Sequence, residues 1–452
     1  MPTLLALLAC NTPPPPETPR PATRPEPPAA LGDAPPADTG QPAVALLRVT
    51  AEAPVAADAR VRAALDVVTD PGGSGKADAV ALSTSVAIEI RGKSSSTFPK
   101  PSYTLELQDR LGRDRALPLL GMPPEADWVL HGPYADKSAL RNALAYAIAR
   151  RMGRWAPRAR FAELRLNGGY EGMYVAVEKP ELDASRVDLP EPTADDPTGG
   201  FLFKIEGGTD GGAGWISASG VVYEVHDPGV GEITTGQFAA LTAAVDQMEA
   251  GVLAGEPLDV HLDVPSFVDF AVVQELTRNV DGYRRSAFLQ LLPAHLGGKV
   301  RAGPVWDFDI AWGNAAFCDG WNPEGLVWEA EAVCEDWAQI PAWWLVVNRT
   351  PGFQTELRCR WEELRRGVLA DDAVEALLSD LAWTIREARA RDDARWHTLG
   401  VEVWPNAYVG DTQSEEVAYL RAWTLARAAW LDASLPGTCD RIGPGPRPLG
   451  IR

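Results

Sequence analysis

The sequence has little positive charge and no long apolar run. Its 452 residues include 42 Lys and Arg against 62 Asp and Glu, which gives a net charge of −20. Phosphate backbones and anionic lipids repel a protein this acidic, so we expect no nucleic-acid partner. No segment approaches the ~20 consecutive apolar residues that cross a bilayer. Attachment to a membrane would therefore require a covalent lipid.

Cysteine is also scarce. The first cysteine in the chain is a candidate site for attachment of such a lipid. Cys10 follows Leu7-Leu8-Ala9, an order that resembles a bacterial lipobox, in which the cysteine becomes the lipidated N-terminus. The apolar run is short and no Lys or Arg precedes it, so a plain hydrophobic N-terminus is the alternative. We predict a lipoprotein-type signal peptide over residues 1–9. The protein would then be exported and anchored at the bacterial cell envelope through Cys10.

The other four cysteines lie in the second half of the chain, at Cys318, Cys334, Cys359 and Cys439. None forms a CxxC pair, so a zinc site is not expected. An exported protein meets an oxidising environment, in which four cysteines predict two disulfides. Three pairings are possible, and we favour the pairing of nearest neighbours.

A change in composition divides the chain. Residues 10–42 are rich in Pro, Ala, Thr and Glu, and such a stretch forms an extended tether, because it cannot bury apolar surface. No similar linker interrupts residues 43–437, which we interpret as one domain followed by a tail over 438–452.

Periodicity predicts strands in the first half of this domain and helices in the second. Alternating residues indicate strands at Val86–Arg91 and Tyr103–Leu107, with a short one at Trp128–Leu130. Asn167-Gly168 predicts a hairpin turn. Helices are expected over Asp136–Met152, where Asp136 would be the cap, from Pro265 towards Arg278, and after a capping box at Thr412. The fold class is therefore α+β.

Two segments carry residues suited to phosphate and metal binding. Residues 91–100 combine a glycine, hydroxyl groups and three cations, as a phosphate site needs, although a solvated basic hairpin is an equal alternative. Asp307 and Asp309 stand two residues apart among large apolar residues. If that segment is extended, both carboxylates point to one side and can share Mg²⁺. The alternative is a pair of structural aspartates.

The order of these segments is that of a protein kinase. A loop that covers phosphate, a helix, a hinge, a catalytic Asp and a metal-binding Asp follow one another in kinases. Here Asp281 occupies the place of the catalytic Asp and comes before Asp307. Ser286 lies five residues after Asp281, where kinases have a metal-binding Asn.

The chain resembles the CotH kinase family, atypical kinases of spore coats and exported bacterial proteins. The resemblance spans roughly residues 82–435. It rests on the stretches 90–95, 98–100, 127–130, 134–142, 166–174, 178–179, 279–283 and 303–314. It implies a kinase-like α+β fold for residues 43–437, ATP and Mg²⁺ as cofactors, and transfer to Ser or Thr of a protein substrate.

Roles for individual residues follow from this resemblance and from the order of the motifs. The catalytic residue is Asp281, the metal ligands are Asp307, Asp309 and Ser286, and the nucleotide-binding residues are Arg91, Ser94, Lys100, Glu178 and Lys179. The helix over Asp136–Met152 has no glutamate placed to pair with Lys100, so this part of the kinase scheme does not carry over. The alternative function is a surface-displayed binding or assembly module that keeps the fold without turnover.

Overall fold

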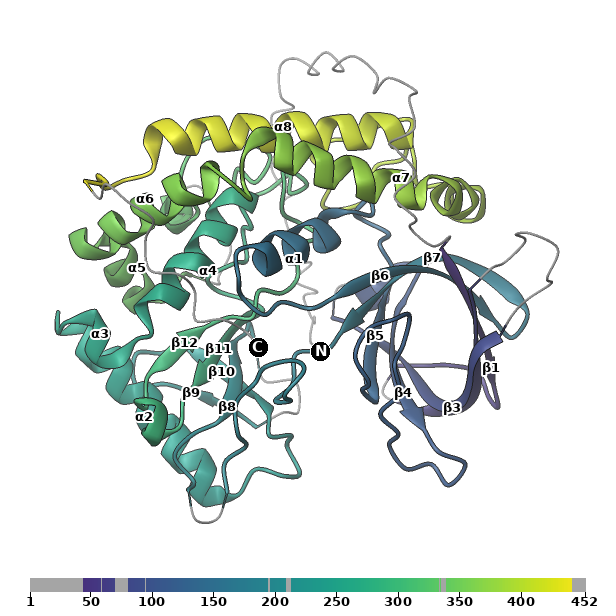
Figure 1. The fold of residues 1–452 in the computed structure, drawn as a ribbon, viewed down its shortest axis with the longest axis horizontal. Helices are drawn as coiled ribbons and strands as arrows, with labels where there is room; N and C mark the ends of the chain where they lie inside the picture. Colours follow the sequence, from purple (N-terminus) through teal and green to yellow (C-terminus); the bar gives the residue numbers. More distant parts are fainter. Residues whose placement is uncertain are drawn as a thin grey trace, which may run out of the picture.

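A computed structural model describes residues 44–57, 59–69, 80–93, 95–193, 196–208, 213–332, 334 and 339–440. The predicted signal peptide, Cys10, the tether and Ser94 lie outside these residues. In the described part, a β-barrel precedes a larger half that combines one sheet with most of the helices, so the chain is α+β (Figure 1).

Seven strands form the closed barrel, in the order β1-β2-β3-β4-β5-β7-β6. They are β1 (Ala45–Ala51), β2 (Val61–Val68), β3 (Val80–Arg91), β4 (Ser102–Gln108), β5 (Asp127–His131), β6 (Ala159–Leu166) and β7 (Gly169–Glu178). Neighbouring strands are antiparallel except for β1 and β6, which run parallel and close the barrel. Alternate residues such as Leu65, Leu105 and Leu164 point inward and are fully buried, which is the period of two expected of strands.

The second half contains a five-stranded sheet in the order β12-β11-β8-β10-β9. Its strands are β8 (Phe201–Ile205), β9 (Gly214–Ile216), β10 (Val222–Asp227), β11 (Ala287–Leu291) and β12 (Val300–Ala302). The helices are α1 (Arg141–Arg151), α2 (Thr235–Leu253), α3 (Leu258–His261), α4 (Val264–Thr277), α5 (Ala342–Arg349), α6 (Pro351–Arg365), α7 (Asp371–Trp396) and α8 (Gln413–Ser434). Short 3-10 turns occur at Ser95–Thr97, Ala294–Leu296 and Val327–Ala332.

Helix α1 lies in the middle of the molecule, between the barrel and helices α7 and α8 (Figure 1). Its Leu140 cap and its residues Leu144 and Ile148 are buried in the main core, as their spacing predicts. The same core includes α4 and the stacked pair Trp343 and Trp344, whose ring centroids are 4.7 Å apart. Segments that are far apart in the sequence therefore pack together around α1.

Most locally encoded elements are confirmed. The three predicted strands are β3, β4 and β5, and Asn167 and Gly168 have the positive φ angles of a tight hairpin turn between β6 and β7. Thr412 caps α8 by accepting a hydrogen bond from the Glu415 amide. None of the described helices is long and apolar enough to cross a membrane.

The prediction for the start of α1 was wrong by five residues. Asp136 is not the cap, because the helix begins only at Arg141. The Asp136 carboxylate instead reaches over a turn and accepts a hydrogen bond from the Arg141 amide at 2.9 Å. Ala139, inside this turn, has a φ of 59°, which an α-helix does not allow. Polar side chains thus stabilise the turn in place of an earlier helical start.

The favoured cysteine pairing is present. Cys318 and Cys334 form one disulfide and Cys359 and Cys439 form the other, with Cα atoms 4.3 Å and 4.8 Å apart. The first closes a loop directly after the Asp307 segment. The second joins α6 to the residues that follow α8.

Candidate active site

The predicted catalytic and metal-binding aspartates occupy two loops that flank one hairpin. Asp281 belongs to the loop that follows α4 and leads into β11. Asp307 and Asp309 belong to the loop that follows β12. Because β11 and β12 pair as antiparallel neighbours, the start of one and the end of the other lie at the same end of the sheet. Residues 26 positions apart are thereby brought together.

Asn279 joins the two loops. Its side-chain amide donates to the backbone carbonyl of Asp307 at 3.1 Å, and its side-chain oxygen accepts from the Asp281 amide at 3.2 Å. Asn279 is almost completely buried, so these are bonds in a dry environment, where leaving a polar group unpaired is costly. One side chain therefore sets the distance between the two candidate loops.

The segment that contains Asp307 and Asp309 is not extended, so the condition under which both carboxylates would point to one side is not met. Strand β12 ends at Ala302, Asp307 has a φ of 64°, and a turn begins at Asp309. A left-handed conformation is uncommon for residues other than glycine, although Asp and Asn adopt it more readily than most, and it occurs mainly in turns and functional sites. The charge of Asp309 nevertheless reaches Asp307 and helps to raise the pKa of the Asp307 carboxyl.

Helix α1 clamps this segment from one side. The Asn142 side-chain amide donates to Asp309 Oδ1 at 2.6 Å, and its oxygen accepts from the Phe308 amide at 2.8 Å. The Tyr146 hydroxyl, one turn further along, accepts from the Asp307 amide at 3.4 Å. The positions of Asp307 and Asp309 are thus coupled to the position of α1.

His131 at the end of β5 approaches the same carboxylates from the barrel. Its Nε2 atom lies 3.1 Å from Asp309 Oδ1. Burial opposes protonation of the ring, but the charges of Asp309 and Asp307 outweigh it and raise the pKa of His131 above its usual value. The barrel and helix α1 therefore each place one polar side chain beside the Asp309 carboxylate.

Asp307 is the most perturbed carboxyl group of the cluster. Crowding by the surrounding protein removes part of its hydration and, with the charges of Asp309 and Asp281, raises the pKa of Asp307 to about 7. Its side chain still reaches solvent, and we therefore give more weight to the repulsion than to the lost hydration. Within the described part of the chain, its carboxylate has no hydrogen-bond or ion-pair partner. A cation would relieve this repulsion.

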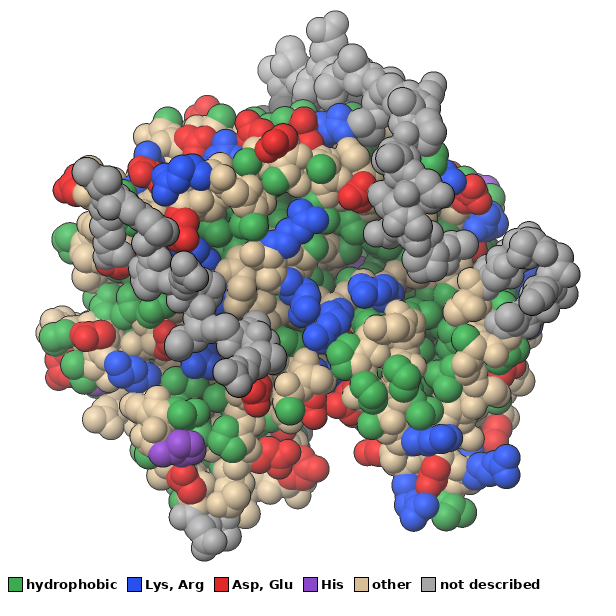
Figure 2. All heavy atoms as spheres, viewed as in Figure 1, with side chains coloured by type: hydrophobic (Ala, Val, Ile, Leu, Met, Phe, Trp, Pro, Cys, Tyr) green, Lys and Arg blue, Asp and Glu red, His purple; other side chains and the backbone are tan. Residues whose placement is uncertain are grey.

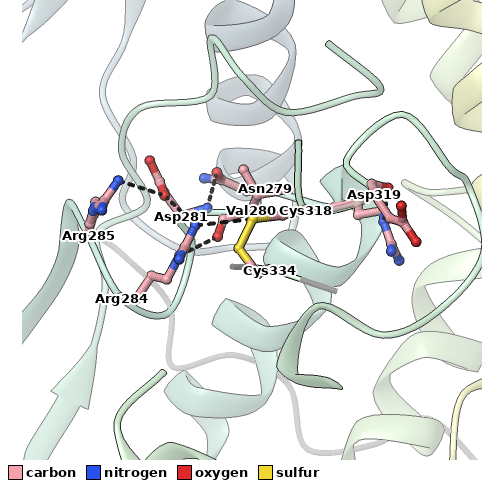
Figure 3. Close-up of a disulfide and its surroundings, with 9 residues drawn as sticks. Asn279, Val280, Asp281, Arg284, Arg285, Cys318, Asp319 and Cys334 are labelled. Atoms are coloured by element: carbon pink, nitrogen blue, oxygen red, sulfur yellow. Dashed lines mark hydrogen bonds and ion pairs between the residues drawn. A yellow bond between two sulfur atoms is a disulfide. The ribbon is translucent and has the colours of Figure 1, made fainter. Parts of the chain in front are cut away.

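Asp281 is held by two arginines of its own loop (Figure 3). Arg284 lies 3.2 Å and Arg285 3.8 Å from Asp281 Oδ1. Arg284 is buried, whereas Arg285 is partly exposed. The Asp281 carboxylate is itself about one-fifth exposed, so a reacting group could reach it.

Among the predicted nucleotide-binding residues that the structure describes, Arg91 is the one whose charge interacts with Asp307. Burial lowers its pKa, while the charge of Asp307 acts in the opposite direction. The Arg91 guanidinium lies 5.9 Å from the centre of the Trp306 ring, within the range of a cation–π contact. The Trp306 ring also stacks on Tyr146 with their centroids 5.9 Å apart.

Lys100 lies elsewhere, in a buried ion pair. Its ammonium group is 2.6 Å from Asp392 Oδ1 of α7, and both side chains are almost completely buried. Burial lowers the pKa of Lys100 to about 8, against the attraction of Asp392. The same Asp392 oxygen accepts from the Met173 amide at 2.8 Å, so the pair links the loop after β3 to α7 and β7. Lys100 therefore has a carboxylate partner, but this partner lies on α7 and not on α1, the helix where the kinase scheme would place it.

The remaining predicted residues are also paired or separate from the cluster. Glu178, at the end of β7, is fully buried and lies 2.6 Å from an Arg158 guanidinium nitrogen. Lys179 lies 2.8 Å from Glu181. Ser286 precedes β11 with a φ of 49°, and within the described residues no recorded contact joins it to either metal-binding candidate. The roles of these residues stay predictions.

The donors present suit Mg²⁺ only if a ligand completes the coordination. The described residues include no group of three or more His, Cys, Asp or Glu side chains arranged to hold a metal ion. Mg²⁺ commonly binds one or two carboxylates, with phosphate oxygens and water supplying the rest. The unpaired carboxylate of Asp307 and the second oxygen of Asp309 fit that pattern.

Sequence reasoning missed the residues that hold the aspartates in place. Asn142 and Asn279 belong to stretches that resemble the family, yet nothing in the one-dimensional pattern gave them a role. His131 and Asp392 lay in strand and helix segments where a structural role was the default. Their functions depend on contacts between distant segments, which periodicity does not report.

A cavity of about 1290 Å³ lies apart from the cluster. Its walls come from the end of α1, from α4 and α6, and from residues 184–188 and 301–305, and it includes neither Asp281 nor Asp307. Seven arginines and seven acidic residues line it, so it has no net formal charge. On the face drawn in Figure 2, basic side chains gather in the middle, and acidic ones border the notch below them.

Together these features define an α+β protein with an acidic cluster held between a closed barrel, helix α1 and a β-hairpin. The family model described as CotH kinase protein matches residues 88–431, most of the chain. The protein therefore belongs to the CotH kinase family, which indicates a kinase-type enzyme. None of the curated proteins matches the chain.

Proposed function

We propose that this protein is an ATP- and Mg²⁺-dependent phosphotransferase that phosphorylates Ser or Thr of exported or surface proteins. The observation that carries the proposal is the grouping of Asp281, Asp307 and Asp309, in which Asp307 is unpaired and electrostatically strained. Kinases need one carboxylate at the acceptor hydroxyl and another at the metal. Membership of the CotH kinase family supports the same chemistry.

Each residue would act through its own position. Asp281 orients the acceptor hydroxyl and takes its proton as the oxygen attacks the γ-phosphorus of ATP. The bond from that phosphorus to the β-phosphate oxygen breaks, and ADP leaves. Asp307, with Asp309, would hold Mg²⁺, which neutralises the phosphate oxygens. Arg91 lies on the same side and would neutralise further phosphate charge.

The test is to replace Asp281 with Ala and to measure three quantities. We expect autophosphorylation and ATP hydrolysis to be lost, while the melting temperature and the affinity for Mg²⁺-ATP stay close to those of the wild type. A variant as active as the wild type would exclude Asp281 from the chemistry. Replacing the exposed Asp188 with Asn is a control that leaves the acidic cluster intact.

The second candidate is a surface-displayed binding module that keeps the fold without turnover. It is favoured by the buried pairing of Lys100 with Asp392, which leaves one fewer cation for phosphate. Both candidates allow Mg²⁺-ATP to bind, but only the first allows phosphoryl transfer. A wild-type protein that binds Mg²⁺-ATP and transfers nothing to itself or to a panel of exported proteins would select the second.

We also propose that the chain is exported and held at the cell envelope by a lipid on Cys10. The order Leu7-Leu8-Ala9-Cys10 and the two disulfides support this location. Fractionation of cells that express the wild type tests it, because a lipidated protein sediments with membranes.

A further inference from the structure

The disulfide between Cys318 and Cys334 lies against the loop that contains Asp281 (Figure 3). Val280, the residue before Asp281, packs with both cysteines and with Ala315 in a small apolar cluster of its own. The disulfide therefore packs against Val280, the residue next to the candidate catalytic carboxylate. It closes a loop that begins nine residues after Asp309.

Arg284 connects the disulfide to the carboxylate. Its side chain is about 4% exposed, so its donors must find partners inside the protein. The Nε atom donates to the Val280 carbonyl at 2.8 Å, one terminal nitrogen lies 3.2 Å from Asp281 Oδ1, and it donates to Cys318 Sγ at 3.8 Å. The rigid fork of an arginine thus contacts the backbone, the carboxylate and the disulfide at once.

Further bonds fix the same segment on its other side. Arg278, just after α4, donates to the Asp319 carbonyl at 3.0 Å. Asn279, between Arg278 and Val280, bonds to both aspartate loops. The loop with Asp281 is therefore held between the metal-binding segment and the disulfide-closed segment. If the disulfide opened, the segment around Cys318 that packs against the Asp281 loop would lose its covalent restraint.

We propose that Arg284 and the Cys318–Cys334 disulfide are positioning elements of the active site, which hold the Asp281 carboxylate where it meets the acceptor hydroxyl. This inference rests on the proposed phosphotransfer. Neither element is given a contact with the acceptor hydroxyl or with ATP. Both act through Asp281, so their removal should slow transfer and leave the binding of Mg²⁺-ATP unchanged.

The second disulfide provides a matched control. Cys359 and Cys439 join α6 to the residues after α8, and neither cysteine belongs to the cluster around Val280. The paired variants are therefore Cys318→Ser/Cys334→Ser and Cys359→Ser/Cys439→Ser. Each removes one disulfide and adds two hydroxyl groups, but only the first alters the surroundings of Asp281.

Steady-state kinetics should separate the two variants. For the first, we expect kcat to fall on the order of 10²-fold, the loss that follows a misplacement of about 1 Å, with KM for ATP unchanged. For the second, kcat should stay within about twofold of the wild type at temperatures where it is folded. Equal kcat values in the wild type and the first variant would overturn the inference.

A second measurement does not depend on turnover. Amide hydrogen exchange of residues 279–286 should accelerate in the first double variant and not in the second. With the disulfide intact, Arg284→Gln should lower kcat, and Arg284→Lys should restore part of it, because the lysine keeps the charge without the fork. Unchanged exchange in the first variant, or equal kcat in both Arg284 variants and the wild type, would also overturn the inference.

The same experiments distinguish this inference from the proposed function. A wild-type protein that neither binds Mg²⁺-ATP nor transfers phosphate refutes the phosphotransferase and the positioning role together. A wild-type protein that transfers phosphate, combined with a first variant that matches it in kcat and in exchange, refutes the positioning role alone.

Discussion

Replacing Asp307 with Asn should stabilise the protein in the absence of metal. The pKa of this carboxyl is raised from 3.8 to about 7. Between these pH values the folded state binds more protons than the unfolded state, so folding stability falls as pH rises from about 4 to 7. Above pH 7 the carboxyl is ionised in both states, and its full destabilising effect on the fold is present. Asn carries no charge, and it is also one of the few residues that tolerate a φ of 64°.

The magnitude follows from the size of the shift. A displacement of roughly three pKa units corresponds to about 4 kcal/mol if it is expressed fully. Because the side chain is open to solvent, screening by water reduces that figure, and we expect a gain of about 1–2 kcal/mol at pH 8. The gain should stay nearly constant above pH 7 and shrink steadily from pH 7 to about pH 4.

Urea unfolding of the wild type and the Asn variant, without divalent ions and at several pH values, measures this difference. In a parallel series with Mg²⁺-ATP, only the wild type should be stabilised further, because binding to the folded state adds to its stability. An Asn variant that is equally stable or less stable at pH 8 without metal would refute the electrostatic reasoning. The Asp188→Asn variant should show neither effect.

Three further outcomes are expected. Lys100→Met should cost about 3–5 kcal/mol in urea unfolding, because it leaves Asp392 buried without its cation; unchanged stability with weaker Mg²⁺-ATP binding would instead assign Lys100 to phosphate. Asn142→Ala should weaken Mg²⁺ binding in the presence of ATP by roughly 10–100-fold in calorimetry, since a residue that orients a ligand is lost; full affinity would show that Asp309 needs no such support. Cys10→Ala should move the protein from the membrane to the soluble fraction, and a wild type already soluble with its leader intact would argue against lipidation.

The parts of the fold that could be predicted are those encoded by neighbouring residues. Asn167-Gly168 specifies its turn through φ angles that few other pairs adopt. The Thr412 hydroxyl caps α8 by accepting a hydrogen bond from the amide of Glu415, three residues further along the chain. Pro265 lies in the first turn of α4, where the backbone needs no amide donor. In each case the physical cause lies within a few positions.

The parts that could not be predicted depend on contacts across the chain. Lys100 finds Asp392 292 positions away, so nothing near Lys100 marks it as buried. The left-handed φ of Asp307 results from the bonds that Asn142, Tyr146 and Asn279 impose on its segment. A period-two pattern cannot show this. The motif order selected aspartates that the structure brings together, but it did not indicate which residues hold them.

Closure of the barrel has a consequence for where the folding unit begins. The match to the family starts at residue 88, after β1, β2 and most of β3. A fragment that began there would leave β6 without its parallel partner β1, and the remnant of β3 without β2. Two unpaired strand edges would then face solvent, and such edges pair readily with other copies of the chain. Residues 45–68 therefore complete the barrel and cover these two edges, although they lie outside the family match.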